Sequence, residues 1–430
     1  MAFPQTTVPI IIVGAGVFGS STALELARKQ PVRHVILVDP TEGANPQSAS
    51  HDVSKIVRDD YVQPALIAMA RKAMAKWRDD PLFTKHFHKI GMLRCQPDTF
   101  NEDSLAAYRD LGILTKSAWM TTADVRDKWP VLAQADFGGL DKVMYNPDYG
   151  FVEAAAALGD VRKEAVAKGV ELVVGEVSRV AFDDAGDCTG VVFRDGRELR
   201  GTVLLCTGAR TASLLVDSAP EREELHAGSR LMATGAVSFT VTLNDDERKR
   251  FEHVPVFKNR APEVMGEGMS LFGNTLKFNC DMCFTRNGVH ASTNKSMSFV
   301  PAAPNLTQWT DWNDKCIPEK LKKRAEKTLK GLHGKELEGK EIDQIRICWD
   351  AHTPNHDFII SPHPRCSNLY VATGGSFHGW KFFPVIGEYI AQMLDGTLDE
   401  TYRALWAWDR GADGPRANTT YDLEGDLGEM

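Results

Sequence analysis

The sequence predicts a two-domain protein of mixed α/β class, in which a domain built on a parallel sheet is interrupted twice by a sheet-rich domain. Three observations lead to this prediction. The chain has 430 residues, more than one simple hydrophobic core usually serves. It begins with a buried strand, a glycine-rich turn, a helix and a second strand. Strands that end in small residues return near positions 205 and 373, and stretches of different character lie between them.

The bulk composition is that of an ordinary globular protein. Hydrophobic residues make up 43% of the chain and charged residues 25%, which argues against disordered and fibrous classes. The net charge of -8, without any run of basic residues, argues against a nucleic-acid partner. The sequence has neither an apolar stretch long enough to span a bilayer nor a cleavable signal at its N-terminus. We therefore expect a cytoplasmic protein without membrane partners.

The cysteines are scattered, and disulfides are not expected in a reducing cytosol. Cys280 and Cys283 form a Cys-x-x-Cys pair, which raises zinc binding or thiol redox chemistry as alternatives. No second pair follows at ligand spacing, and this pair does not open a helix after a strand. We therefore expect these two cysteines neither to bind zinc nor to act in thiol redox chemistry, and we expect no metal site.

The clearest motif is Gly14-Ala15-Gly16-Val17-Phe18-Gly19, which follows the apolar strand Ile10–Val13 and opens a helix that runs to Arg28. In a Rossmann-like unit Gly14 would allow the tight turn, Gly16 the approach of a pyrophosphate, and Gly19 the close packing of helix on strand. The helix N-terminus, at Val17 and Phe18, offers N–H groups to the phosphates. Asp39 ends the second strand and would accept hydrogen bonds from a ribose. The motif predicts a dinucleotide site and leaves FAD and NAD open.

Further elements of the two domains are expected along the chain. Thr202–Leu205 is an apolar strand that closes on Thr207 and Gly208, a pattern that commonly passes near the adenine half of FAD. The other expected elements are strands at 171–174, 190–193, 236–241 and 369–373, helices at 103–111, 319–332 and 384–394, and a solvated turn at 335–340. We assign residues 1–85, 146–211 and 341–430 to the nucleotide-binding domain and residues 86–145 and 212–340 to the substrate domain.

A glycine-rich loop, Gly374–Trp380, follows the last predicted strand and leads into Lys381. If the nucleotide is FAD, backbone N–H groups of this loop would stabilise the negative charge that reduction places on the N1–C2=O edge of the flavin. The donors would come from Gly375, Ser376, Gly379 and Trp380. Lys381 would add a cation, either to the ring edge or to a substrate carboxylate.

Across nearly its whole length the chain resembles the family of monomeric sarcosine oxidases and fungal fructosyl amino acid oxidases (amadoriases). The resemblance is strongest in the glycine motif and in the segments 48–61, 346–360 and 369–386. It implies a glutathione-reductase-type flavoprotein that binds FAD, with Ser48, Lys55 and Val177 among the FAD contacts. Cys348 matches the family cysteine that carries FAD as an 8α-S-cysteinyl adduct, and Lys381 matches the lysine that contacts the substrate carboxylate.

The resemblance also assigns roles to four further cations. Lys277 matches a lysine that activates O2, because a fixed cation stabilises the superoxide formed by the first electron transfer. Lys55 matches a basic catalytic residue on the other side of the flavin ring. Arg58 matches a carboxylate-binding arginine of the sarcosine oxidases, and Arg416 matches an amadoriase arginine with that function.

The chain departs from the family pattern at three places. Asp281 stands where amadoriases have a catalytic glutamate one methylene longer. The phenylalanine-rich substrate loop is replaced by residues 265–272, which read Met-Gly-Glu-Gly-Met-Ser-Leu-Phe. Asp350, two residues after Cys348, replaces an aromatic residue or a second cysteine and is a candidate substrate contact. A fructosyl substrate is therefore not assured by the resemblance.

Together these features predict a monomeric FAD-dependent oxidase of a small-molecule secondary amine, an N-substituted amino acid. The product imine would hydrolyse, and O2 would be reduced to H2O2. The alternatives are a saccharopine- or pipecolate-type amine oxidase and a dehydrogenase of the same fold that passes electrons to a carrier. Two alternatives come from other functional classes: a nucleotide-binding scaffold without catalysis and an NAD-dependent enzyme.

Overall fold

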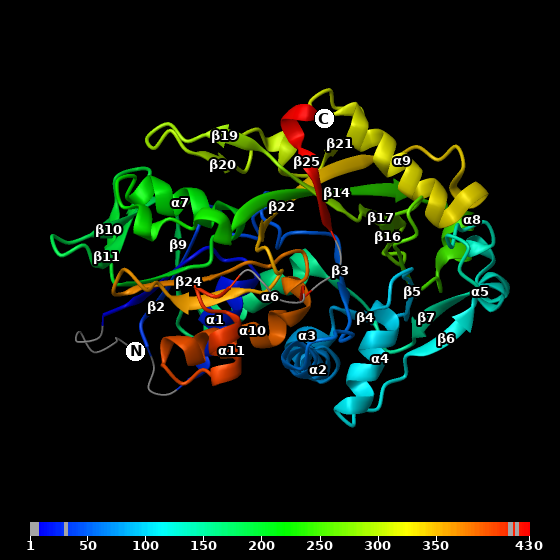
Figure 1. Ribbon diagram of the computed structural model, residues 1–430, viewed down its shortest axis with the longest axis horizontal. Helices are drawn as coiled ribbons and strands as arrows, with labels where there is room; N and C mark the ends of the chain where they lie inside the picture. The colour runs from blue at the N-terminus through cyan, green and yellow to red at the C-terminus, as the bar shows by residue number, and fades with distance from the viewer. Residues whose placement is uncertain (1–7, 30–32, 412–415, 418–420) are drawn as a thin grey trace.

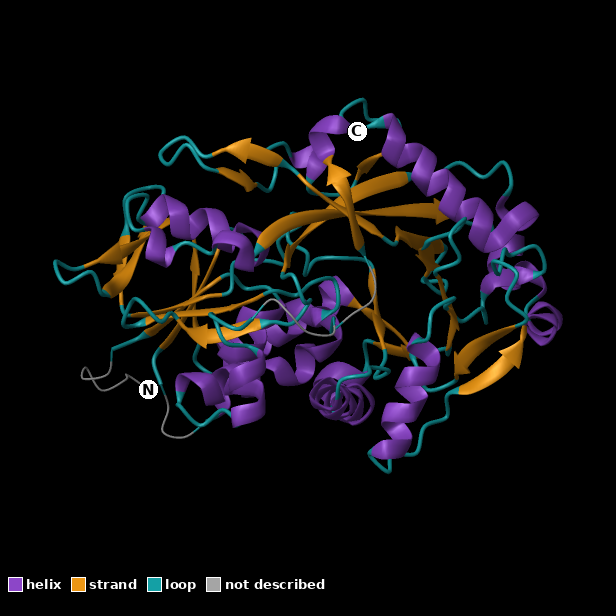
Figure 2. Cartoon of the chain, in the orientation of Figure 1, coloured by secondary structure: helices purple, strands orange, loops and turns teal. Residues whose placement is uncertain are grey.

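Two large sheets organise the computed structural model, which describes residues 8–29, 33–411, 416–417 and 421–430 (Figures 1 and 2). The first has six strands in the order β23-β24-β13-β1-β2-β9. Its members are β1 (Ile10–Val13), β2 (Val35–Asp39), β9 (Glu171–Val174), β13 (Thr202–Leu205), β23 (Ile359–Pro362) and β24 (Leu369–Thr373). Five strands are parallel and β23 pairs antiparallel at the edge. This sheet confirms the Rossmann-like arrangement expected from the glycine motif.

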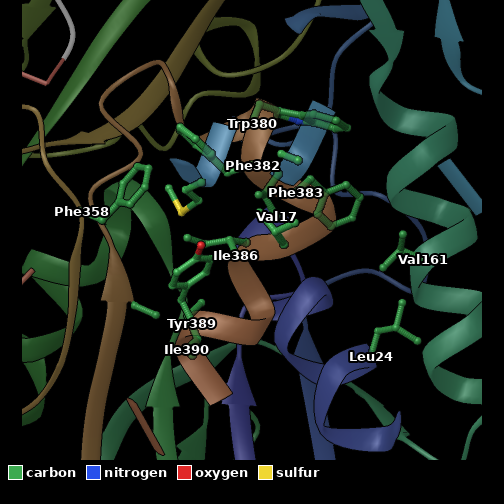
Figure 3. Packing of buried hydrophobic residues seen from close by; sticks show 14 of the residues in the cluster. Val17, Leu24, Val161, Phe358, Trp380, Phe382, Phe383, Ile386, Tyr389 and Ile390 are labelled. Carbon is green, nitrogen blue, oxygen red and sulfur yellow. The ribbon is translucent and has the colours of Figure 1, made fainter. Parts of the chain in front are cut away.

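Helices α1 (Val17–Arg28), α6 (Ala154–Ala167) and α10 (Phe383–Leu394) pack together against this sheet. Figure 3 shows Val17 and Leu24 of α1 in one apolar cluster with Val161 of α6 and Ile390 of α10. The close approach of α1 and α10 depends on Gly387, where an added Cβ would stand 2.2 Å from the carbonyl oxygen of Ser21. The start of α1 is thereby fixed at the carboxyl edge of the parallel strands.

The second sheet has eleven strands and forms the other half of the molecule (Figure 1). Its main path runs β21-β22-β14-β17-β16-β15-β5-β7-β6, with β18 and β25 joined beside β14. The bounds are β5 (Met92–Cys95), β6 (Ala118–Thr121), β7 (Lys142–Asn146), β14 (Met232–Thr242), β15 (Val256–Asn259), β16 (Gly266–Gly268), β17 (Thr275–Cys280), β18 (Met282–Thr285), β21 (Thr310–Asp311), β22 (Gln344–His352) and β25 (Asp422–Asp426). Helix α9 (Glu319–His333) packs on β14, β16 and β17.

Smaller elements complete the described chain. Three short sheets contain β3 (Ser54–Val57), β4 (Phe87–Lys89) and β8 (Gly150–Glu153); β10 (Val177–Phe182), β11 (Cys188–Phe193) and β12 (Glu198–Arg200); and β19 (Asn287–Val289) and β20 (Ser296–Ser298). The remaining α-helices are α2 (Pro64–Asp79), α3 (Pro81–Thr84), α4 (Phe100–Asp110), α5 (Thr122–Lys128), α7 (Thr211–Ser218), α8 (Asp245–Phe251) and α11 (Glu400–Leu405). No helix among the described residues is long and apolar enough to cross a membrane.

The six-stranded sheet draws its strands from the three segments assigned to the nucleotide-binding domain. The exceptions to a simple division are β22 and β25, which follow position 341 and yet belong to the eleven-stranded sheet. The segment boundaries therefore stay a proposal. Because β22 carries Cys348 and Asp350, these two residues reach the space between the sheets from the substrate side.

Candidate active site

A cavity of about 800 Å³ extends from the carboxyl edge of the six-stranded sheet to the face of the eleven-stranded sheet. Most of the predicted site residues lie on its wall. They are Gly14, Gly16, Val17, Phe18, Asp39, Ser48, Lys55, Arg58, Val177, Thr207, Gly208, Cys348, Asp350, Gly375, Gly379, Trp380 and Lys381. Five predicted residues are not among the described residues that line it, namely Gly19, Lys277, Asp281, Ser376 and Arg416.

One arm of the cavity has the geometry of a dinucleotide cradle. Gly14 adopts φ +99°, and an added Cβ there would lie 2.5 Å from the carbonyl oxygen of Cys206. Helix α1 begins at Val17, and its cap residue Gly16 has no side chain to satisfy the first N–H groups. The N–H of Val17 donates to Ser50 Oγ at 3.0 Å, so the N–H of Phe18 on the cavity wall is the one available to a phosphate. Asp39 accepts hydrogen bonds from the N–H of Ala15 (2.8 Å) and of Thr41 (3.2 Å), which fix its carboxylate on the wall. The residues present fit a dinucleotide with a free ribose hydroxyl.

The segment 48–52 is tied to the C-terminal half by two buried side chains. Arg346 of β22, completely buried, donates from Nη2 to the carbonyl oxygen of Ser48 at 2.6 Å and from Nη1 to that of His51. Trp380 donates from Nε1 to the carbonyl oxygen of Ser50 at 2.9 Å. Sequence reasoning placed Arg346 in a strong segment but gave it no role.

A buried carboxylate joins the two predicted catalytic lysines. Lys277 Nζ donates to Asp52 Oδ2 at 2.7 Å and to the carbonyl oxygen of Ser54 at 2.9 Å, and Lys55 Nζ lies 2.8 Å from the same Asp52 oxygen. Burial lowers the pKa of Lys277 to about 8, against the opposing effect of Asp52. Burial alone would raise the pKa of Asp52, but Lys277, Lys55 and Arg346 hold it well below its usual range. Lys277 therefore stands behind Lys55 rather than on the wall.

A second group of charges surrounds Lys381. Its Nζ donates to the carbonyl oxygen of His378 at 2.8 Å, and no carboxylate of a described residue pairs with it. Burial and the nearby Arg58 guanidinium lower the pKa of Lys381 well below its ordinary value. Arg58 itself donates to Asp60 Oδ1 at 2.6 Å, and Asp60 also contacts Arg94 Nη2 at 2.8 Å. The local charge therefore favours an incoming anion.

The glycine-rich loop differs from its expected arrangement. The N–H of Ser376 donates to the carbonyl oxygen of Ala351 and that of Gly379 to the carbonyl oxygen of Gly375, both at 2.9 Å. Neither N–H is free to stabilise a reduced flavin, and the prediction for these two residues is wrong in that respect. The sequence does not show which loop amides are used internally, because that depends on the turn the loop adopts.

Asp350 holds the same loop. Its Oδ2 accepts the N–H of Phe377 and its Oδ1 that of Ala351, each at 2.8 Å. Phe377 and the preceding Ser376 have φ values of 58° and 43°, which are unfavourable for side chains with a Cβ and need such support. Burial raises the pKa of Asp350. Asp350 lies on the cavity wall, but its carboxylate oxygens already accept backbone N–H groups of Ala351 and Phe377. Its role as a substrate contact stays a prediction.

Two predicted residues lie away from the cavity wall. Asp281 is completely buried and accepts hydrogen bonds from Lys258 Nζ at 2.8 and 3.1 Å. Arg416 is exposed and pairs with Asp422 at 3.0 Å, outside the wall formed by the described residues. Neither is among the described residues that line the cavity, so their roles toward a ligand stay predictions. Asp281 follows directly after β17, and its carboxylate is used by Lys258.

Where the eleven-stranded sheet forms the cavity wall, a further carboxylate on it is Glu267, which was not predicted from the sequence. Ser238, Lys258 and Asn279 stand beside it on neighbouring strands. A signal was present in the sequence, because polar residues alternate with apolar ones within otherwise buried strands. In β17 the pattern Lys277-Phe278-Asn279 places both polar side chains on one face.

Comparison with known proteins places these observations in context. The profile of the protein family described as FAD dependent oxidoreductase matches residues 9–393. The L-saccharopine oxidase of Schizosaccharomyces pombe is 26% identical over 427 residues, which span 93% of this chain and 92% of that protein. The monomeric sarcosine oxidase of Bacillus sp. (strain B-0618) is 23% identical and is covered to 92%, with 90% of this chain aligned.

Solved structures agree with the fold. The fructosyl peptide oxidase from E. terrenum superposes with a TM-score of 0.83 at 25% identity, and the match covers 100% of this chain and 98% of that one. This likeness confirms the predicted two-domain architecture.

Proposed function

Because the chain belongs to the FAD dependent oxidoreductase family, we propose that it oxidises the C–N bond of an N-substituted amino acid with O2 as the electron acceptor. The substrate is a secondary amine, the imine product hydrolyses in water, and O2 is converted to H2O2. The observation that carries the proposal is one cavity whose wall joins the cradle at Gly14 and Gly16 to the cations Lys55, Arg58 and Lys381. The printed names of the relatives, saccharopine oxidase and sarcosine oxidase, support this substrate class.

Bound FAD supplies the redox chemistry, since it accepts a hydride equivalent from the amine and delivers two electrons to O2. The N–H of Phe18 at the start of α1 would hold its pyrophosphate, and Asp39 would bind its ribose. Val177, Thr207 and Gly208 line the same arm. Gly375, on the wall further along, is a candidate for the ring edge.

Cys348 is the proposed attachment point for FAD, through an 8α-S-cysteinyl bond. Its thiol is free, buried and on the cavity wall. A negative charge on its sulfur would interact favourably with Lys55 and Lys277. If the bond exists, acid-precipitated wild type keeps its yellow colour and carries the mass of FAD, whereas Cys348→Ala releases its pigment on unfolding. Pigment that washes free of the wild type would refute the attachment.

Lys381 and Arg58 are the proposed grip on the substrate carboxylate. Both lie on the wall, and Lys381 is the one without a carboxylate partner among the described residues. A carboxylate that arrives there would gain a charge-assisted hydrogen bond and would raise the pKa of Lys381. The grip would orient the reacting C–N bond, which supplies part of the acceleration.

Positive charge around the site would also prepare the amine. A secondary amine must lose its proton before it can give up a hydride equivalent. Lys55, Lys277 and Arg58 place positive charge around the site, and like charges disfavour a protonated amine. Lys277 would then serve the second half-reaction, because its ammonium stabilises negative charge that develops on O2.

A second candidate function is a dehydrogenase that passes electrons to a carrier. Its support is the contact of Lys277 with Asp52 at 2.7 Å, because a counter-ion offsets the charge that O2 reduction needs. Under either function, we propose that the protein is a monomer and acts in the cytoplasm on a small-molecule amine.

The deciding experiment is a panel of secondary amines added to the holoenzyme without oxygen. Bleaching of the yellow colour by an N-substituted amino acid, followed by recovery with one H2O2 per amine when O2 is admitted, supports the oxidase. Bleaching without recovery in O2 points to the dehydrogenase. A protein that is colourless as purified, or that no secondary amine bleaches, would refute the proposed function.

A further inference from the structure

Four side chains form a continuous polar row across the eleven-stranded sheet. Ser238 of β14 lies opposite Asn279 of β17, Asn279 lies opposite Glu267 of β16, and Glu267 lies opposite Lys258 of β15. Residues that face each other on neighbouring strands project from the same face of the sheet. All four line the cavity, so the polar row is part of its floor.

The hydrogen bonds along the polar row all run toward Glu267. Ser238 Oγ donates to Asn279 Oδ1 at 2.7 Å, and Asn279 Nδ2 donates to Glu267 Oε2 at 3.0 Å. From the other end Lys258 Nζ donates to Glu267 Oε1. Burial by itself would raise the pKa of Glu267, but Lys258 and its other neighbours hold it well below the usual range. Glu267 is therefore a carboxylate at neutral pH.

The polar row presents acceptors to the cavity. An ionised carboxylate has about four lone-pair positions, and the two hydrogen bonds above leave the others of Glu267 open. Ser238 uses its hydrogen toward Asn279 and keeps its lone pairs. Lys258 is only 1% exposed and directs its hydrogens to Glu267 and Asp281. Within this described part of the sheet one N–H of Asn279 is the donor that remains, so a ligand that covers the row must bring donors of its own.

The polar row also lies beside the proposed reaction centre. Asn279 is two residues from Lys277 in β17, which puts both side chains on the same face. The charge of Glu267 acts on both Lys381 and Lys277. If the substrate carboxylate occupies Lys381 and Arg58, the group on the other side of the amine nitrogen is the one that faces the row.

We propose that the polar row is the subsite for the N-substituent of the substrate and that it selects substituents with a hydrogen-bond donor, a hydroxyl or an ammonium. Apolar and carboxylated substituents of similar size would be disfavoured, because they bring no donor to the open lone pairs of Glu267 or repel its charge. This inference rests on the proposed function and narrows its substrate class.

The test uses four N-substituted glycines whose substituents are propyl, 2-hydroxyethyl, 2-aminoethyl and carboxymethyl. Turnover of each is measured as kcat/KM. Binding is measured separately with thioether analogues, in which sulfur replaces the amine nitrogen, from the change that they cause in the visible absorbance of the holoenzyme. The hydroxyethyl and aminoethyl analogues should bind roughly tenfold or more tightly than the propyl analogue, as expected for a hydrogen bond to a charged group.

The variant that tests the residue is Glu267→Gln, and its matched control is Glu263→Gln, an exposed glutamate paired with Lys327. Glu267→Gln should reduce the preference for the aminoethyl analogue by about tenfold while propyl binding changes less than about threefold. Glu263→Gln should bind all four analogues as the wild type does. Ser238→Ala tests the other end of the row and should weaken the hydroxyethyl analogue selectively.

Two outcomes would overturn the inference. One is a wild type that binds the propyl analogue as tightly as the hydroxyethyl and aminoethyl ones, and this result does not require any variant to fold. The other is a Glu267→Gln protein that loses affinity for all analogues by one factor, since that indicates a structural role. If the analogues show the donor preference but no amine reduces the enzyme, the subsite stands and the proposed function fails. If the enzyme oxidises the amines but shows no donor preference, the proposed function stands and the subsite fails.

Discussion

Asp52 is the single residue on which the charge of Lys277 depends most. Burial lowers the pKa of Lys277 to about 8, and the Asp52 carboxylate 2.7 Å away works against that shift. Asp52→Asn should therefore lower the pKa of Lys277 further. Reoxidation of the reduced enzyme by O2 should be fast below about pH 8 in the wild type, where Lys277 is charged, and should fall above it. In Asp52→Asn this fall should move to lower pH, as measured by stopped-flow absorbance.

The control for this experiment is Asp59→Asn. Asp59 is a buried carboxylate that accepts hydrogen bonds from Tyr108 and Tyr149 and pairs with neither active-site lysine. Both variants should lose stability. Removal of one partner from the buried ion pair at Asp52 costs about 3 kcal/mol or more, and loss of the charged hydrogen-bond acceptor at Asp59 costs about 1–3 kcal/mol. Only Asp52→Asn should shift the pH profile, and identical profiles for the two variants would separate Asp52 from oxygen chemistry.

Lys277→Met tests the cation itself. The side chains have similar length, but the variant has no charge with which to stabilise negative charge on O2. We expect reoxidation to slow on the order of 100-fold, as is usual when one electrostatic donor is removed from a reacting centre. Anaerobic reduction by the amine should slow much less. Equal slowing of the two half-reactions would remove Lys277 from the oxygen site.

At the scale of elements, the contact between α1 and α10 positions the cradle. A Cβ at Gly387 would lie 2.2 Å from the carbonyl oxygen of Ser21, so Gly387→Ala must push the helices apart. We expect a loss of about 1–3 kcal/mol in stability, the usual cost of overpacking. Thermal unfolding of the holoenzyme measures it.

Gly159 of α6 supplies the matched control for that change. Nothing lies within 4 Å of a Cβ added there, and the position is helical. Gly159→Ala should be neutral or should stabilise by up to about 1 kcal/mol, because alanine loses less backbone entropy than glycine. A Gly387→Ala protein as stable as Gly159→Ala would show that the helices yield at little cost.

At the scale of the whole molecule, Arg346 links the two sheets. It belongs to β22 of the large sheet and holds the carbonyl oxygens of Ser48 and His51, beside the nucleotide arm. Arg346→Lys keeps the charge but cannot span two carbonyl groups with one ammonium. The variant should melt several degrees lower and incorporate less FAD per chain than the wild type. Arg403→Lys, at an exposed site, should match the wild type in both.

The nucleotide-binding half was predictable because its signals are local. Ile10–Val13, the glycine motif and Asp39 occur within one short segment, and the structure has the strands and α1 there. The sheet-rich half was predicted as a class only, since its strand order depends on pairings between residues far apart in the chain. Helix α2 was not anticipated, although Leu66, Ala70, Met74 and Trp77 recur at helical spacing.

The candidate site was predictable to a similar degree. Residues in continuous motifs, such as Cys348 and Lys381, lie on the cavity wall. Asp281 and Arg416 match family positions in the sequence, but their contacts with Lys258 and Asp422 form only in the folded chain and could not be predicted. Glu267 was missed because a carboxylate becomes part of a wall only when its strand is paired with its neighbours.

The lack of a carboxylate partner for Lys381 among the described residues has a consequence for the heat of binding. The pKa of Lys381 lies well below the ordinary value in the ligand-free protein, and a carboxylate beside it would raise that pKa. At a pH between the pKa of the free side chain and the raised pKa of the complex, association with a simple carboxylate should therefore draw a proton out of the buffer. Isothermal titration in two buffers that differ in ionisation enthalpy would then give two different apparent enthalpies, and their difference counts the protons taken up.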